Sequence, residues 1–289
     1  AMGTAVCAGL LLGLDADRMD HALGLAAGGD CGLECHHEEP LHQIKSLEKG
    51  RAVEAGVLSA LLAHEGFHGP REVLTIEQGF FDAFLGLPSA GHDVIKELGT
   101  NYTMREIAYK RYPIGGPNQT PMHGFLQLIK QHGLSAEDIE QIEVSVARNA
   151  FHTVTTNHHP SIHMESIFHI AAVYGEITFA HIHDPRYRED ARVKAFKDRV
   201  RIIIIPRPGH ATREQRMQSG LTVRTRNGKT LRQELRFAVM SEAEIQTKFH
   251  DLAGLRLDSK KVTALESKLM SIETERNVTA LIRELELPY

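Results

Sequence analysis

The chain has 289 residues, of which 42% are hydrophobic and 24% charged, with a formal net charge of −4. This length can bury one or two domain cores, and the composition is that of an ordinary globular protein. The net charge excludes a broad basic surface for nucleic acid or an anionic membrane, and the longest strongly apolar run, 200–206, is too short to cross a bilayer. Three cysteines cannot all pair with one another, which favours a reducing, cytoplasmic location.

The first fourteen residues are apolar and rich in small side chains, without the basic segment that opens a secretory signal. Small residues at helical spacing are typical of a tightly packed internal helix. We expect either that this helix continues a larger helical domain or that it is a natural terminus packed against the rest of the chain.

Residues 1–89 are rich in Ala, Gly and Leu and predict a helical domain. Asp15 or Asp17 can cap the helix that follows them, because a carboxylate accepts from the amides of a first helical turn. Apolar residues at helical spacing predict another helix over 51–64. Pro70 predicts the start of a further short helix.

Residues 90–240 mix strand and helix patterns. Apolar residues alternate with polar ones over 142–146, which predicts a half-buried strand. The continuous apolar run 200–205 predicts a strand covered on both faces. Asn227-Gly228 lies between two short strand patterns and predicts a hairpin with a tight turn. Helical patterns occupy the segments between these strands, at 121–132, 165–174 and 188–196.

Residues 241–289 are helical again. Ser241 and Glu244 have the spacing of a capping box, and three amphipathic segments follow. The order helical, α+β, helical predicts that the last block packs back onto the first.

Several short segments, in this order and spacing, resemble the MmgE/PrpD family. Two carry a lysine: Lys45 opens an alanine-rich helix pattern, and Tyr109-Lys110-Arg111-Tyr112-Pro113 resembles a Lys-x-aromatic-Pro signature. Gln119-Thr120 resembles the 2-methylcitrate dehydratase branch of the family. The segments that carry the resemblance are 22–26, 45–52, 56–63, 66–70, 79–81, 109–113 and 119–120.

The resemblance implies an α+β fold: an all-helical domain formed by both chain ends (1–89 and 241–289), with an inserted α+β domain (90–240). Members include 2-methylcitrate dehydratase, cis-aconitate decarboxylase and iminodisuccinate epimerase, which act on small polycarboxylic acids without a metal or organic cofactor. It therefore implies a small di- or tricarboxylate ligand, no cofactor and a homodimer, with no nucleic-acid or membrane partner.

Family members are longer, and by the resemblance this chain begins partway through the helical domain. The preceding stretch would carry an aspartate-rich loop and two active-site histidines, so a partner polypeptide that supplies them is a further expectation. Glu48 also stands where the family would have a histidine. A carboxylate there would repel an anionic substrate, which predicts an altered substrate or lost catalysis.

Lys45 and Lys110 are the predicted catalytic residues, in a cleft that the resemblance puts between the two domains. A polycarboxylate needs fixed positive charge, both to bind and to stabilise the negative charge that grows as a proton or CO2 leaves. Lys45 lies at the start of a predicted helix, whose amides favour an anion. Lys110 precedes Tyr112-Pro113, a stiff pair that can hold the lysine in a cleft.

Arg111, Gln119 and His163 are the predicted substrate-binding residues. Arg111 adds a second cation beside Lys110, and Gln119 ends a glycine-containing loop that can present amides to a ligand. His163 belongs to a histidine-rich stretch and could line the same cleft. The alternative for each is an ordinary surface or structural side chain.

The chain contains 18 histidines, so a metal site is a separate hypothesis. Cysteine and imidazole are ligands for zinc, but their spacing here is not that of a standard zinc signature, and we predict no metal. One candidate cluster comprises Cys31, Cys35, His36, His37 and His42. The other comprises His158, His159, His163, His169, His181 and His183.

Two functions of different classes follow. The first is a lyase or isomerase of the MmgE/PrpD type, with dehydration of the 2-methylcitrate kind the favoured reaction. The second is a non-catalytic remnant, or one subunit of a split enzyme, that binds carboxylates or assembles with a partner.

Overall fold

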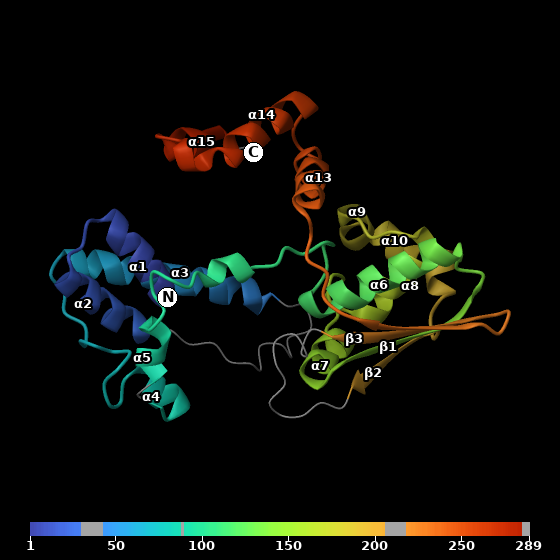
Figure 1. Ribbon diagram of the computed structural model, residues 1–289, viewed down its shortest axis with the longest axis horizontal. Helices are drawn as coiled ribbons and strands as arrows, with labels where there is room; N and C mark the ends of the chain where they lie inside the picture. The colour runs from blue at the N-terminus through green and yellow to red at the C-terminus, as the bar shows by residue number, and fades with distance from the viewer. Residues whose placement is uncertain (30–42, 88–89, 206–217, 285–289) are drawn as a thin grey trace. The chain divides into compact units, whose positions relative to one another are not determined.

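We describe a computed structural model of the chain, over residues 1–29, 43–87, 90–205 and 218–284. By internal contacts the chain divides into two compact units (Figure 1). The first comprises Ala1–Ile107 with His152–His159, and the second comprises Ala108–Phe151 with Pro160–Tyr289. Each unit is described by itself.

Three mutually packed helices form the first unit: α1 (Met2–Leu11), α2 (Ala16–Ala27) and α3 (Ile44–His64). Asp15 caps α2 by accepting from the Arg18 N–H at 2.9 Å, which confirms one of the two predicted caps. Three shorter helices follow α3: α4 (Phe80–Leu85), α5 (Ala90–Ile95) and a 3-10 helix (Thr103–Glu106).

Small residues let these helices approach closely. Most of the buried hydrophobic side chains on α1, α2 and α3 are alanines, as at Ala5, Ala22 and Ala60. A Cβ added to Gly56 of α3 would lie 2.4 Å from the Ala1 carbonyl oxygen. The backbone at Gly56 therefore packs directly against the backbone at Ala1, with no room for a side chain between them. The first unit is therefore held by near contact of backbones rather than by large apolar side chains.

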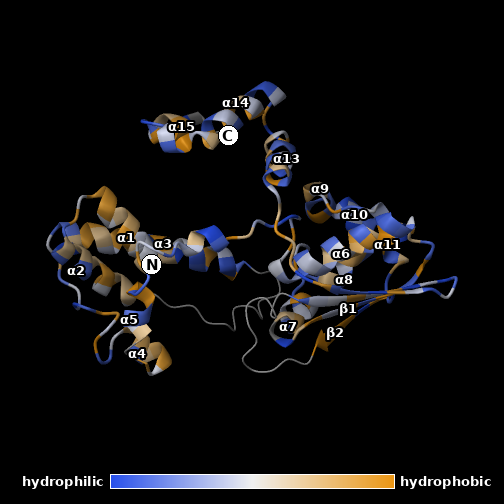
Figure 2. Cartoon of the chain, viewed as in Figure 1, coloured by the Kyte–Doolittle hydropathy of each residue, from blue (hydrophilic) through white to orange (hydrophobic). Residues whose placement is uncertain are grey.

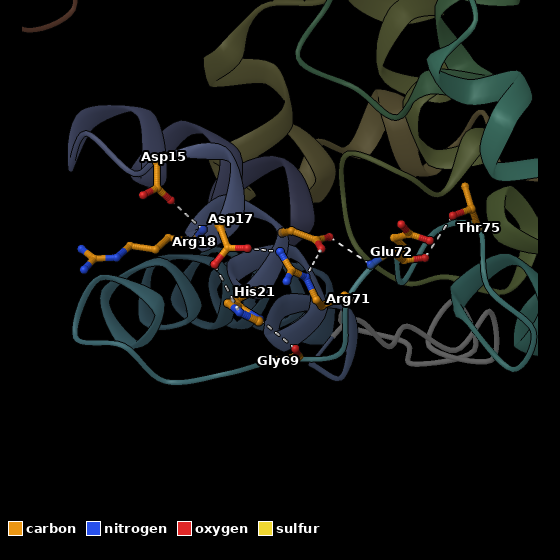
Figure 3. Close-up of polar contacts among 9 residues, drawn as sticks. Asp15, Asp17, Arg18, His21, Gly69, Arg71, Glu72 and Thr75 are labelled. Atoms are coloured by element: carbon orange, nitrogen blue, oxygen red, sulfur yellow. Dashed lines mark hydrogen bonds and ion pairs between the residues drawn. The ribbon is translucent and has the colours of Figure 1, made fainter.

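Polar contacts tie the segment after α3 to α2 (Figure 3). The Arg71 guanidinium pairs with Asp17 and, at 3.3 Å, with Asp20. The His21 Nδ1–H donates to the Gly69 carbonyl at 3.0 Å, so this buried histidine has a structural partner. These contacts fix α2 against a loop more than 40 residues away in sequence.

The short helix predicted after Pro70 is absent: the residues form a run of turns. Glu72 has a φ of 52°, which is incompatible with a right-handed helix. Its backbone N–H donates to Asp20 Oδ1 at 3.0 Å, and this tertiary contact holds the residue in its turn conformation (Figure 3).

A four-stranded sheet of order β2-β1-β3-β4 organises the second unit. The central strand β1 (Ile139–Ala147) is parallel to β2 (Val200–Ile205) and antiparallel to β3 (Ser219–Thr225). The edge strand β4 (Thr230–Leu235) is antiparallel to β3. The sheet is thus mixed, and this unit carries the β part of the α+β fold.

Two long helices pack on this sheet (Figure 1). α6 (Gly116–His132) contacts β3 and β4, whereas α8 (Met164–Tyr174) contacts β2, and the two helices touch each other. The rings of Phe125 and Phe168 meet between them at 5.2 Å. Fully buried large side chains from helices and strands fill this core, namely Met122, Leu128, Ile139, Ile142, Ile167 and Ile170.

The remaining helices are shorter or follow the sheet. They are α7 (Arg148–Thr156), α9 (Phe179–His183), α10 (Pro185–Glu189), α11 (Ala191–Lys194), α13 (Glu242–Ala253), α14 (Ser259–Met270), a 3-10 helix (Ile272–Thr274) and α15 (Val278–Glu284). The predicted capping box of Ser241 and Glu244 is present at the start of α13. None of the helices in the described ranges is long and apolar enough to span a membrane.

One strand prediction needs correction, and the predicted hairpin with a tight turn is confirmed. β2 is hydrophobic along most of its length (Figure 2), but it is an edge strand whose last three isoleucines are only half-buried. The hairpin at Asn227-Gly228 exists, but only Gly228 has a positive φ, of 85°. A two-residue type I′ turn needs positive φ at both positions, so the loop instead closes through a Thr225 N–H to Lys229 O bond of 2.9 Å.

The contacts group the three C-terminal helices with the second unit, and the leading segment of the first unit ends at Ile107. The predicted domain boundaries stay a prediction. The predicted return of residues 241–289 to the helical domain stays a prediction.

Candidate functional site

A cavity of about 340 Å³ lies within the second unit. The chain segment before α6, the first turn of α6, the end of β1 and the start of β3 all contribute to its wall. The residues that line it are Ala108, Tyr109, Lys110, Gly116, Pro117, Gln119, Thr120, Val146, Ala147, Ala150, Gln218, Ser219 and Phe237. Two of the five predicted site residues, Lys110 and Gln119, are therefore brought to one cavity.

Within the part of the chain that the structure describes, Lys110 is the one formally charged lining side chain, and the lining residues include no carboxylate and no imidazole. Two hydroxyl-bearing residues, Thr120 and Ser219, are each only 6% exposed. Each hydroxyl can both donate to and accept from a ligand. An ammonium and two such hydroxyls beside apolar walls match an anionic ligand that has a short carbon skeleton.

The first turn of α6 adds to the positive character of the cavity. Its N-cap, Gly115, supplies no side-chain cap, and Pro117 lies in the first turn. Pro117 has no N–H and the Asn118 N–H donates to the Gly115 carbonyl at 3.1 Å, so it is the positive end of the dipole of this 17-residue helix, rather than a set of free amides, that favours a bound anion.

The Gln119 side chain holds the loop that precedes α6. Its Nε2 donates to the carbonyls of Tyr112 at 2.9 Å and Ile114 at 3.0 Å, and its Oε1 accepts from the Tyr112 N–H at 3.1 Å. All three contacts are to backbone, so the amide serves the loop in this conformation. Its predicted contact with substrate stays a prediction.

Arg111 is paired with a carboxylate of the chain itself, and its predicted contact with substrate stays a prediction. Its guanidinium forms a two-point ion pair with Glu244 of α13, in which Nη2 and Oε2 are 3.2 Å apart. Hydrogen bonds from Arg111, and then from the Ser241 N–H, lower the pKa of the Glu244 carboxyl to about 2. The charge of Arg111 is therefore balanced by a carboxylate at neutral pH.

Arg111 and Lys110 also line a second, more apolar hollow of about 850 Å³ against α13. Tyr112 contributes to that hollow, and its hydroxyl is 3.1 Å from Nδ1 of His123. Burial raises the pKa of Tyr112 and lowers the pKa of His123, so both groups are neutral around pH 7. The segment 110–113 thus separates two cavities of different polarity.

Lys45 lies in the first turn of α3 and is exposed to solvent. It belongs to the first unit, whereas the other four predicted site residues belong to the second. Its convergence with Lys110 on one ligand stays a prediction. Glu48 lies one turn further along the same helix.

His163 is the N-cap of α8, where its Nδ1 accepts from the Ser166 N–H at 3.3 Å. It is not among the residues that line the 340 Å³ cavity. Burial, followed by the nearby His163, lowers the pKa of His169 to about 4, so His169 is neutral at physiological pH. The position of His163 gives it a helix-capping role, and its predicted contact with substrate stays a prediction.

Three or more His, Cys, Asp or Glu side chains do not gather as a metal site anywhere in the part of the chain that the structure describes. The first candidate metal cluster, from Cys31 to His42, lies outside those residues.

The sequence patterns missed Thr120, Ser219 and Phe237 as lining residues. Thr120 was noticed only as the neighbour of Gln119, and Ser219 merely begins a strand. No motif marks such residues, because they come from α6, from the start of β3 and from the segment after β4, and only the tertiary fold brings these together.

Comparison with known proteins matches two family models in chain order. Residues 1–92 match the MmgE/PrpD N-terminal domain and residues 112–271 match the MmgE/PrpD C-terminal domain. A cis-aconitate decarboxylase of Aspergillus terreus (strain NIH 2624 / FGSC A1156) is 24% identical over 98% of this chain and 62% of its own length. Another from Aspergillus terreus is 28% identical over 50% of this chain and 32% of its own.

The chain thus spans less than two thirds of the length of these curated relatives. The two domain models together cover most of its residues, and the second alone covers more than half. The chain belongs to the MmgE/PrpD family.

Proposed function

We propose that this chain is part of a lyase for small di- or tricarboxylic acids and that the cavity beside Lys110 binds one carboxylate of the substrate. One observation carries the proposal: Lys110 is the one charged side chain among the described residues that line the cavity. The adjoining helix start adds positive potential, and the similarity to cis-aconitate decarboxylases supports an acid of this class.

The chemistry of such a lyase needs these groups. Removal of a proton or CO2 next to a carboxylate places growing negative charge on the substrate carbon skeleton. The Lys110 ammonium and the helix start stabilise that charge, while the hydroxyls of Thr120 and Ser219 donate to a second polar group of the acid. The apolar walls keep the carbon skeleton in place.

Two lyase reactions are consistent with this arrangement. Gln119-Thr120 favours dehydration of a 2-methylcitrate-like acid, whereas the curated relatives favour decarboxylation of a cis-aconitate-like acid. Both begin with the same bound carboxylate, so the binding test does not depend on which reaction follows.

The test is calorimetric titration of the chain with cis-aconitate and with 2-methylcitrate at pH 7. Lys110→Met should weaken binding of either acid by about tenfold or more, because a charge-assisted contact is lost. The control is Lys260→Met, at an exposed lysine of α14 that is absent from the cavity wall. Equal affinity of wild type and Lys110→Met would refute the proposal.

A second candidate function is carboxylate binding without turnover. The absence of an imidazole or carboxylate among the described lining residues favours it, because a proton acceptor of ordinary kind is then missing from this cavity. NMR of each acid incubated with the chain distinguishes the two: tight binding without loss of substrate signal supports this candidate, and conversion to product supports the lyase.

A further inference from the structure

α13 holds the backbone of the Lys110 segment from one side. The Lys248 ammonium donates to the Lys110 carbonyl oxygen at 2.6 Å. One turn earlier on the same helix, Glu244 pairs with Arg111. Residues four apart project from one face of a helix, so both contacts come from the same side of α13.

The Glu244 carboxylate is held in place by the cap of α13 as well as by Arg111. Its Oε2 accepts from the Ser241 N–H at 2.8 Å, in the reciprocal cap that begins α13. In return, the Ser241 hydroxyl oxygen accepts a hydrogen bond from the Glu244 N–H at 3.3 Å. The carboxylate is therefore oriented by the helix start, and its pairing with Arg111 orients the loop.

Gln119 holds the same segment from the other side through the backbone of Tyr112 and Ile114. Residues 110–114 consequently have side-chain contacts to backbone or guanidinium at four of their five positions: Lys110, Arg111, Tyr112 and Ile114. Lys110 is anchored at its carbonyl while its side chain lines the cavity.

We infer that Lys248, assisted by Glu244, is a positioning residue that sets where the Lys110 ammonium lies in the cavity. The inference rests on the proposed carboxylate-binding role of Lys110. A flexible lysine loses rotamer freedom when it binds a ligand, and a backbone fixed beforehand reduces the further ordering that binding requires. Lys248 acts through the Lys110 backbone, and the ligand contacts Lys110.

A double-mutant cycle tests this, because Lys248 also carries charge near the site. Calorimetry with cis-aconitate at pH 7 compares wild type, Lys248→Met, Lys110→Met and the double variant. Lys248→Met alone should weaken binding about fivefold, and it should change affinity less than about twofold in the Lys110→Met background. Lys260→Met is the surface-charge control, and its affinity should equal that of wild type.

A second variant keeps the test independent of Lys248 charge and of α13 folding. Glu244→Gln preserves the cap, which takes either residue, but removes the ion pair to Arg111. Its effect on cis-aconitate affinity should also vanish in the Lys110→Met background, with thermal unfolding close to that of wild type.

The outcomes separate the two proposals. If Lys110→Met leaves affinity unchanged, the carboxylate site is refuted and the positioning role falls with it. If Lys110→Met weakens binding but the Lys248→Met effect is absent, or is the same in both backgrounds, the site stands and the positioning role is overturned.

Discussion

The two units are built on opposite packing rules. The helical unit buries alanines and brings glycine backbones against neighbouring chain, as at Gly24, whose added Cβ would lie 2.0 Å from the Pro70 carbonyl oxygen. The sheet unit buries phenylalanine, isoleucine and methionine between two helices and a sheet. The first should therefore tolerate loss of volume better than gain, and the second the reverse.

The difference also bears on where a ligand can bind. Helices in backbone contact leave little space between them, whereas a helix start set beside strand ends leaves the 340 Å³ cavity. The first unit is thus closely packed, and the candidate site lies in the second.

The largest effect should come from emptying the core of the sheet unit. Phe168→Ala removes a ring that is 0% exposed and should cost about 3–5 kcal/mol of unfolding free energy, because it leaves a cavity. Urea denaturation followed by circular dichroism measures the change. Phe179→Ala, at a ring that is 46% exposed, should cost less than half as much. Equal costs for the two would contradict the proposed core.

Filling the helical unit should have the next largest effect. Gly24→Ala forces its new methyl group against Pro70 and should destabilise the first unit by about 2–3 kcal/mol. The matched control is Gly50→Ala on α3, where nothing lies within 4 Å of the added Cβ. That change should stabilise the protein by about 0.5–1 kcal/mol, because alanine is the better helix former. Thermal unfolding of both variants measures these changes. A neutral Gly24→Ala would contradict the difference in packing between the two units.

The smallest effect is a pH dependence of the sheet unit. His169 has a folded pKa of about 4, below its unfolded value, so between about pH 6.5 and 4 the unfolded chain binds a proton that the folded chain does not. Stability should therefore fall as the pH is lowered through that window, by about 1–2 kcal/mol after allowance for partial exposure.

Urea denaturation at several pH values checks the pH effect. His169→Gln should flatten the dependence between pH 6.5 and 4, whereas His132→Gln, at the exposed end of α6, should leave it unchanged. An unaltered slope in His169→Gln would show that another group sets the acid sensitivity.

Local patterns predicted much of the secondary structure. Alternation predicted β1, the Ser-x-x-Glu spacing predicted the cap of α13, and Asn227-Gly228 predicted the hairpin. These signals depend on residues a few positions apart, which the chain brings together by itself. The exact turn and the edge position of β2 depend on sheet pairing, and no local pattern encodes them.

The site was less predictable for the same reason. Lys110 was predicted to lie in a cleft because a stiff Tyr-Pro follows it, and it lines a cavity, whereas its catalytic role stays a prediction. The partner of Arg111 was not predictable, because it is Glu244, which is 133 residues away. Ser219 likewise reaches the cavity only when β3 pairs with β1. Two adjacent cations give the same signal in the sequence, and they differ in the residues that the fold places near them.

The hydrogen bonds of the Gln119 amide restrict which residue can occupy this position. Two backbone carbonyls of the loop accept from this side chain, and one backbone N–H donates to it, so the side chain must supply two N–H donors and one acceptor at a set distance from the backbone. Glutamate would set a carboxylate oxygen against carbonyl oxygens, and asparagine is one methylene short. Homologous chains that keep this loop should therefore keep the glutamine.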